Sequence, residues 1–84
     1  MGYFNLQMLI LFELMITKND KRLAKQIRTY RRRLKMTQEE LANKAGVTPK
    51  YIQYIEATKR IPSLKSVNKI AKALGVKVKD LFTF

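Results

Sequence analysis

The chain has 84 residues, with 18 Lys plus Arg against 6 Asp plus Glu, which gives a net charge of +12, and it contains no His and no Cys. This length predicts a single domain, and 46% of hydrophobic residues is enough for a small core and too many for a disordered basic tail. The missing residue types exclude zinc fingers, thiol nucleophiles, histidine bases and disulfides. The positive charge indicates a polyanionic partner, with nucleic acid ahead of an anionic membrane surface.

The charge is distributed unevenly along the chain. Residues 1–17 contain Glu13 and no Lys or Arg, and all 18 basic residues lie from Lys18 onward. A polar break separates the two regions at residues 17–20, which read Thr-Lys-Asn-Asp. We therefore predict two parts, an apolar N-terminal segment over residues 1–17 and a basic domain over residues 18–84.

The apolar N-terminal segment gives two conflicting structural signals. Its Leu and Met residues favour a helix, whereas every even-numbered position from 4 to 16 is apolar, which is the pattern of a half-buried strand. Gln7 and Glu13 interrupt the apolar run, so we expect no membrane span, which needs about 20 apolar residues. The segment is expected to pack on the core of the basic domain or to form a two-fold dimer contact, and membrane-surface attachment is a third alternative.

Helix-capping residues divide the basic domain into five short predicted helices. The expected starts are at Asp20, Thr37, Thr48 and Pro62-Ser63, with a last short helix near Val78, and Gly46 and Gly75 are expected to end two of them. The predicted inner faces are Leu23, Ile27, Tyr30 and Leu34; Leu41, Ala42 and Ala45; Ile52 and Ile55; Leu64, Val67, Ile70, Ala71 and Leu74; and Val78, Leu81 and Phe82. No strand pattern occurs after Lys18, and the fold class is therefore predicted to be all-α.

The second and third predicted helices are only about three residues apart, which requires a tight bend between crossed axes. Ala42 supplies a small residue where the two helices touch, and Gly46 follows in the turn. Ile52 and Ile55 then anchor the second helix of the pair, six and nine residues after the glycine. Together with Gln38 at the start of the first helix, this pattern resembles the helix-turn-helix of the phage Cro/repressor family.

The resemblance covers residues 23–82 and rests on two segments, TQEELANKAGVTPKYIQYIE and PSLKSVNKIAKALGVKVKDLF. It implies a five-helix lambda-repressor-like domain that regulates transcription by binding double-stranded DNA. It further implies a homodimer on a two-fold operator, with the helix from about Pro49 to Ala57 in the major groove. The dimer surface is expected from residues 1–17, or from Leu81, Phe82 and Phe84, or from both.

The resemblance also assigns DNA contacts to individual residues. Those at base-reading positions are Thr48, Pro49, Lys50 and Tyr54, with Tyr51 as a further candidate. Those expected at the phosphates are Gln38, Gln53, Thr58, Lys59 and Arg60. Relatives often have Arg-Gly directly after the Glu that closes the recognition helix, where this chain has Ala57-Thr58. Because Thr is disfavoured in the left-handed backbone conformation, we expect a different C-cap at this position.

Spacing alone predicts a buried ion pair. Arg31 lies four residues after Ile27, and Glu56 lies four residues after Ile52, so both charges fall on apolar helix faces. Buried charges are tolerated when they are paired, and the resemblance implies the same Arg–Glu contact. Two surface side chains are the alternative interpretation. The sequence leaves two roles for three further cations: Arg32, Arg33 and Lys35 either face DNA or are solvated. Lys65, Lys69 and Lys72 are expected to be solvated.

Two other classes of function remain as alternatives. The same fold also serves antitoxins, which would have a toxin partner, and protein-interaction modules. A membrane-surface peptide is the other alternative. An enzyme is not expected, because Glu39 and Glu40 are explained by helix capping and the chain offers no nucleophile–base pair. We expect no cofactor, no metal, no small-molecule ligand and a cytoplasmic location, with which the lack of Cys agrees.

Overall fold

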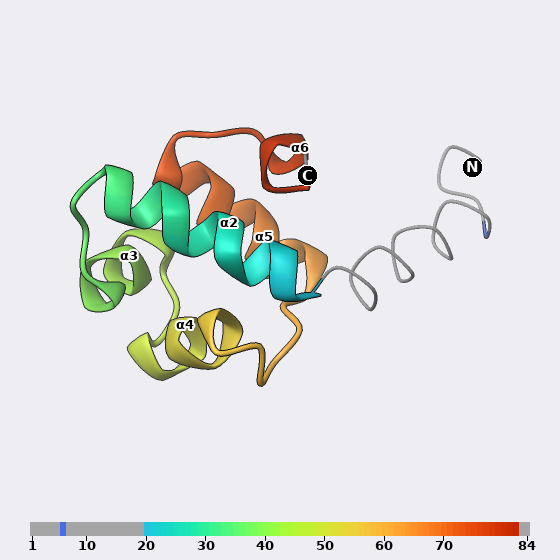
Figure 1. Cartoon of the computed structure of the whole chain (residues 1–84), viewed down its shortest axis with the longest axis horizontal. Helices are drawn as coiled ribbons and strands as arrows, with labels where there is room; N and C mark the ends of the chain where they lie inside the picture. Colours follow the sequence, from blue (N-terminus) through green and yellow to red (C-terminus); the bar gives the residue numbers. More distant parts are fainter. Residues whose placement is uncertain (1–5, 7–19, 83–84) are drawn as a thin grey trace.

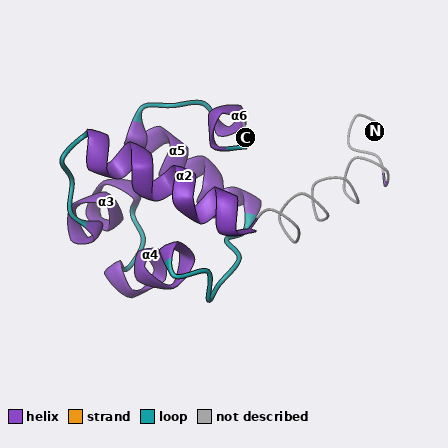
Figure 2. Ribbon diagram, in the orientation of Figure 1, coloured by secondary structure: helices purple, strands orange, loops and turns teal. Residues whose placement is uncertain are grey.

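The computed structural model of the chain describes Leu6 and residues 20–82 (Figure 1). Between residues 20 and 82 the helices are α2 (Asp20–Arg33), α3 (Gln38–Ala45), α4 (Pro49–Glu56), α5 (Leu64–Leu74) and α6 (Val78–Leu81). This part of the chain contains no strand, as Figure 2 shows, and the all-α prediction is confirmed for it. The predictions for residues 1–17 lie outside the described residues, apart from Leu6. Among the described residues, no helix combines the length and the apolar character needed to cross a membrane.

The starts of α3, α4 and α5 are fixed by side-chain caps. Thr37 Oγ1 accepts a hydrogen bond from the Glu40 N–H at 3.0 Å, and Glu40 Oε1 accepts one from the Thr37 N–H at 2.8 Å. This reciprocal pair is the predicted capping box. The hydroxyls of Thr48 and Ser63 cap α4 and α5, each by accepting from the backbone N–H three residues further on at 3.1 Å. Short local contacts therefore determine where these helices begin.

Four helices end in the same left-handed backbone conformation. Gly46 and Gly75 adopt φ values of +73° and +72° after α3 and α5, as their lack of a Cβ allows. Lys35 and Thr58 adopt φ values of +56° and +60° after α2 and α4, although both carry a side chain. Two helix ends thus hold a residue that is strained in this conformation.

The expectation of a different C-cap after α4 is wrong. The Thr58 N–H donates to the Ile55 carbonyl at 3.0 Å and the Lys59 N–H donates to the Tyr54 carbonyl at 2.8 Å. These are the two hydrogen bonds that usually accompany a glycine at this position. They satisfy carbonyl groups at the end of α4, and this gain offsets the strain at Thr58.

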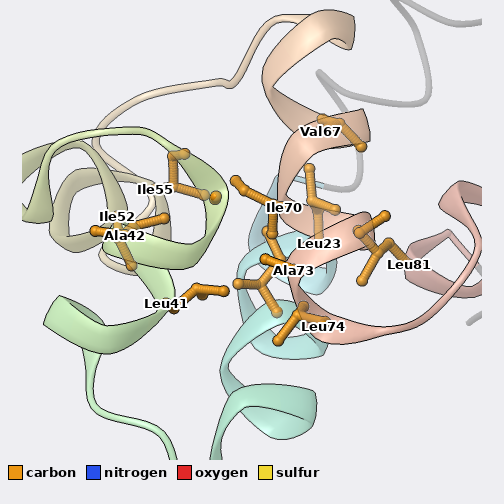
Figure 3. Close-up of a cluster of buried hydrophobic side chains, with 13 residues drawn as sticks. Leu23, Leu41, Ala42, Ile52, Ile55, Val67, Ile70, Ala73, Leu74 and Leu81 are labelled. Carbon is orange, nitrogen blue, oxygen red and sulfur yellow. The ribbon is translucent and has the colours of Figure 1, made fainter.

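The core lies where α2, α3, α4 and α5 meet, with α6 packed against α2 and α5 (Figure 3). Its largest fully buried side chains are Leu23, Ile27, Leu41, Ile52, Ile55, Ile70, Leu81 and Val67. Two residues predicted on inner faces are instead exposed, Leu34 to 51% and Leu64 to 45%. Leu34 follows the last residue of α2, where the chain turns toward α3, and Leu64 is the first residue of α5. Helical spacing predicted the inner faces of α2 and α5 correctly, but these two positions lie at the helix ends, beyond the part of each helix that contacts the core.

The C-terminal residues proposed for a dimer surface require a correction. Leu81 is fully buried in the core of its own chain, so it is not available to a second copy. Phe82 is partly buried and packs against the same core. Phe84 lies outside the described residues.

Candidate nucleic-acid interface

Helix α4 has a buried face and an exposed face. Ile52, Ile55 and Glu56 are buried. Lys50, Gln53 and Tyr54 are exposed, and their spacing of three and four residues places them together on the opposite side of the helix. The turn between α3 and α4 spans residues 46–48, and the two helices pack against each other. The outer face of α4 is therefore free for a partner, while the inner face holds the helix in place.

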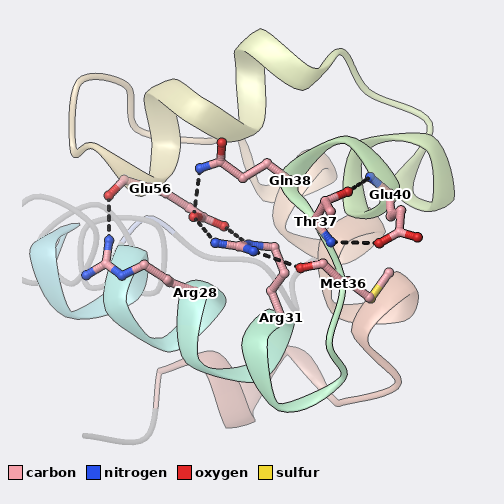
Figure 4. A network of polar contacts seen from close by, with 7 residues as sticks. All are labelled: Arg28, Arg31, Met36, Thr37, Gln38, Glu40 and Glu56. Atoms are coloured by element: carbon pink, nitrogen blue, oxygen red, sulfur yellow. Dashed lines mark hydrogen bonds and ion pairs between the residues drawn. The ribbon is translucent and has the colours of Figure 1, made fainter.

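The predicted ion pair joins α2 to the last residue of α4 (Figure 4). Arg31 Nε donates to Glu56 Oε2 at 2.7 Å, and Arg31 Nη2 donates to Glu56 Oε1 at 2.9 Å. Arg31 is 8% exposed and Glu56 is 5% exposed, so the contact is buried and the surface alternative is wrong. A guanidinium that donates two parallel hydrogen bonds to a carboxylate is the strongest geometry for such a pair.

Three further hydrogen bonds extend this pair into a network across three helices. Gln38 Nε2 donates to Glu56 Oε1 at 3.0 Å, Arg31 Nη1 donates to the Met36 carbonyl at 2.8 Å, and Arg28 Nη1 donates to the Glu56 carbonyl at 3.0 Å. No buried side-chain nitrogen or oxygen of the described residues lacks a partner. The network fixes the position of α4 relative to α2 and α3, because its hydrogen bonds connect groups of all three helices.

The residues predicted to contact phosphates lie in three places. Gln38 is partly buried at the start of α3, and its contact with Glu56 gives it a structural role besides the predicted phosphate contact. Gln53 lies on the outer face of α4, and Lys59 and Arg60 are exposed in the loop that joins α4 to α5. Thr58 is partly buried at the start of that loop. The structure brings the loop residues together but leaves Gln38 on a separate helix end.

The predicted base-reading residues differ in their positions on α4. Lys50 and Tyr54 are exposed, and Lys50 Nζ lies 6.0 Å from the centroid of the Tyr54 ring, within reach of a cation–π contact. Thr48 is exposed, with its hydroxyl engaged in the cap of α4, and Pro49 is partly buried as the first residue of that helix. Tyr51 is partly buried and packs against the core. Tyr51 therefore faces the core, whereas Lys50 and Tyr54 face solvent.

Sequence reasoning missed Arg28, which belongs to the network behind α4, and two residues beside α4, Ile61 and Ser66. Arg28, three residues before Arg31, lies on the same side of α2, and this spacing was available as a signal for a second contact with α4. Ile61 is 48% exposed beside Arg60. It lines an open depression of about 500 Å³ together with Tyr51, Arg60 and Ser66. No sequence pattern indicates the depression, because residues from the turn before α4, from α4, from the following loop and from α5 form it jointly.

A helix-turn-helix family model matches residues 27–81 of the chain, most of the stretch for which the sequence predicted the resemblance. The chain belongs to the helix-turn-helix family, of the Cro/repressor type. Within this family α3 and α4 are the helix-turn-helix pair, and the buried Arg31–Glu56 contact stabilises it from α2.

Three similar proteins extend this result. An HTH-type transcriptional regulator of Archaeoglobus fulgidus is 43% identical over 58 residues, which are 69% of this chain and 82% of that protein. Control protein C.BamHI of Bacillus amyloliquefaciens is 47% identical over 49 residues, which are 58% of this chain and 60% of that protein. The crystal structure of the restriction-modification controller protein C.AhdI from Aeromonas hydrophila superposes with a TM-score of 0.74 at 26% identity, covering 76% of this chain and 97% of that one.

Proposed function

We propose that this helix-turn-helix protein regulates transcription by binding specific sequences of double-stranded DNA, without catalysis, in the cytoplasm. The observation that carries the proposal is the outer face of α4, where Lys50, Gln53 and Tyr54 are exposed on a helix that the buried network fixes from behind. A recognition helix of this family places residues of its N-terminal part against base edges in the major groove.

The proposal divides the DNA contacts between bases and phosphates. Lys50 is expected to donate to guanine O6 and N7, and the Tyr54 ring to contact a thymine methyl group. Thr48 and Pro49 complete the base-reading set. The phosphate contacts are assigned to Gln38, Gln53, Thr58, Lys59 and Arg60. Phosphate contacts fix the register of the protein on DNA and carry little sequence information.

The functional form is proposed to be a homodimer on a two-fold operator. One domain of this size contacts too little DNA for tight binding, and two copies on one face of the duplex would bind half-sites about 34 Å apart. Residues 1–17 remain the proposed source of the dimer contact. Mass measurements of the full chain and of a fragment of residues 18–84 test this assignment, because the fragment is expected to be monomeric while the full chain is dimeric.

Selection of binding sites from random double-stranded DNA, followed by a salt titration of the affinity, tests DNA binding itself. With about 4–6 phosphates neutralised per monomer, log K is expected to fall with log salt concentration at a slope of roughly −4 to −5 per monomer. Lys59→Ala is expected to weaken all sequences alike, and Lys69→Ala on α5 serves as a matched control. A flat salt dependence, or selected pools without a common sequence, would contradict the proposal.

Some of the similar proteins support one physiological type of regulator. Two of them are named as a control protein and as a restriction-modification controller. We propose a controller of this kind as the first candidate, and an antitoxin with a toxin partner as the second. The genes next to the coding sequence distinguish the two: a restriction endonuclease and methyltransferase support the controller, whereas a toxin gene supports the antitoxin.

A further inference from the structure

The side chains of Tyr51 and Arg60 are in contact, although they belong to different elements. Arg60 Cζ lies 5.2 Å from the centroid of the Tyr51 ring, within the range of a cation–π contact. Tyr51 is in the first turn of α4, where its N–H donates to Thr48 Oγ1. Arg60 is exposed in the loop after α4. The contact therefore connects a loop cation to a helix that the core holds in place.

The two partners differ in how firmly they are held. Tyr51 is partly buried and packs against the core, and it lines the depression between α4 and the start of α5. Arg60 has a long side chain with many rotamers, and it is exposed in the loop between α4 and α5. A side chain of this kind loses conformational entropy when it binds, and a ring that already holds its guanidinium reduces this loss.

We infer that Tyr51 is a positioning residue whose ring presents Arg60 to a DNA phosphate. This inference rests on the proposed function, and it gives Tyr51 a role different from the base reading that the family resemblance implies. Lys50 and Tyr54 lie on the outer face of α4, whereas Tyr51 faces the depression that it shares with Arg60. The ring therefore acts on the affinity for every sequence rather than on the choice of base.

A double-mutant cycle between the two residues tests this role. Tyr51→Leu is expected to weaken binding to all sequences by about two- to tenfold, the cost of ordering one long side chain. Arg60→Ala is expected to lower the steepness of the salt dependence by about 1, because one phosphate contact is lost. In the Arg60→Ala background, Tyr51→Leu is expected to have no further effect. Tyr51→Phe keeps the ring and is expected to retain the affinity that Tyr51→Leu loses.

The exposed tyrosine of α4, Tyr54, provides a matched control. Tyr54→Leu also removes a ring that lies near a cation, Lys50. Its effect is expected to add to that of Arg60→Ala and to change the preference at one base position. Coupling between Tyr51 and Arg60, without coupling between Tyr54 and Arg60, supports the inference.

Two results would overturn the inference while leaving DNA binding intact. One is strict additivity of Tyr51→Leu and Arg60→Ala in a protein that still binds its operator with a steep salt dependence. The other is a changed base preference in Tyr51→Leu, which would make Tyr51 a base-reading residue. Loss of salt-dependent binding in the unmodified chain would instead contradict the proposed function itself.

Two measurements that leave Tyr51 unchanged keep the inference testable even where Tyr51→Leu does not fold. The side-chain protons of Arg60 are expected to show an upfield ring-current shift in the NMR spectrum of the free protein, and Arg60→Lys is expected to lose affinity although it keeps the charge. Unshifted Arg60 protons together with full affinity of Arg60→Lys would overturn the inference.

Discussion

The two faces of α4 use charge in opposite ways. On the buried face, Glu56 receives hydrogen bonds from Arg31 and Gln38, and its charge joins three helices. On the outer face, Lys50 is exposed to solvent beside Tyr54. A charge that is buried and paired is costly to disturb, whereas an exposed charge contributes little to stability. One short helix thus separates the residues that the fold needs from those that a partner would meet.

The largest expected effect is on the buried face. Glu56→Ala is expected to lower the free energy of unfolding by about 3–5 kcal/mol, because it leaves the Arg31 guanidinium buried without its carboxylate. Denaturant unfolding monitored by circular dichroism measures this loss. Glu39→Ala, on the exposed side of α3, is the control and is expected to change stability by less than about 0.5 kcal/mol. A loss below about 1 kcal/mol for Glu56→Ala would mean that the two faces do not differ as described.

The next effect is on the outer face and concerns binding rather than stability. Lys50→Ala is expected to cost about 1–3 kcal/mol of discrimination at one or two base positions, because it removes the donor to guanine. Equilibrium binding to the selected operator and to its single-base variants measures this. The free energy of unfolding is expected to stay within about 0.5 kcal/mol of that of the unmodified chain. A large loss of stability would place Lys50 among the structural residues instead.

A smaller effect on the free energy of unfolding is expected just after the end of α4, at Thr58. Thr58→Gly is expected to raise the free energy of unfolding by about 0.5–1 kcal/mol, because glycine removes the strain of the left-handed conformation at some cost in chain entropy. Thermal unfolding measures the gain. Gly46→Ala is the reverse test. Its new Cβ would have no neighbour within 4 Å, but the alanine would have to adopt the φ of +73° that Gly46 has. The free energy of unfolding is expected to fall by about 1 kcal/mol. A destabilised Thr58→Gly protein would show that the threonine side chain contributes contacts of its own.

The smallest effect is expected from the cations of α5. Lys69→Ala is expected to leave the base preference unchanged, to change stability by less than about 0.5 kcal/mol and to reduce the association rate slightly at low salt. Stopped-flow association at two salt concentrations measures this. A Lys69→Ala protein with an altered base preference would extend the DNA contacts beyond α4 and its loop.

The sequence predicted the helices because their starts and ends depend on neighbouring residues. Thr37, Thr48 and Ser63 each cap the helix that follows, and Gly46 and Gly75 occupy the left-handed positions for which glycine is suited. It also predicted the Arg31–Glu56 contact, because helical spacing alone places each charge on an apolar face. Both kinds of inference need no knowledge of where distant segments lie.

The features that sequence reasoning missed depend on how the helices are placed relative to one another. The contact of Gln38 with Glu56 and that of Tyr51 with Arg60 require the crossing of α3 with α4 and the course of the loop after α4. Thr58 adopts the left-handed conformation because the hydrogen bonds at the end of α4 stabilise it against its own preference. Leu64 is exposed because the first residue of a helix lies beyond the core that the rest of the helix covers.

The Glu56 network also bears on how such a protein diverges. The network that sets the position of α4 lies on the side opposite its outer face, so exchanges at Lys50, Gln53 and Tyr54 leave the scaffold intact. Under the proposed function, a duplicated copy would acquire a new operator through single substitutions on the outer face, each intermediate remaining folded. Selection on Arg31, Gln38 and Glu56 would meanwhile act against change. Related copies would then differ least at the interior carboxylate and most at the surface with which they recognise a sequence.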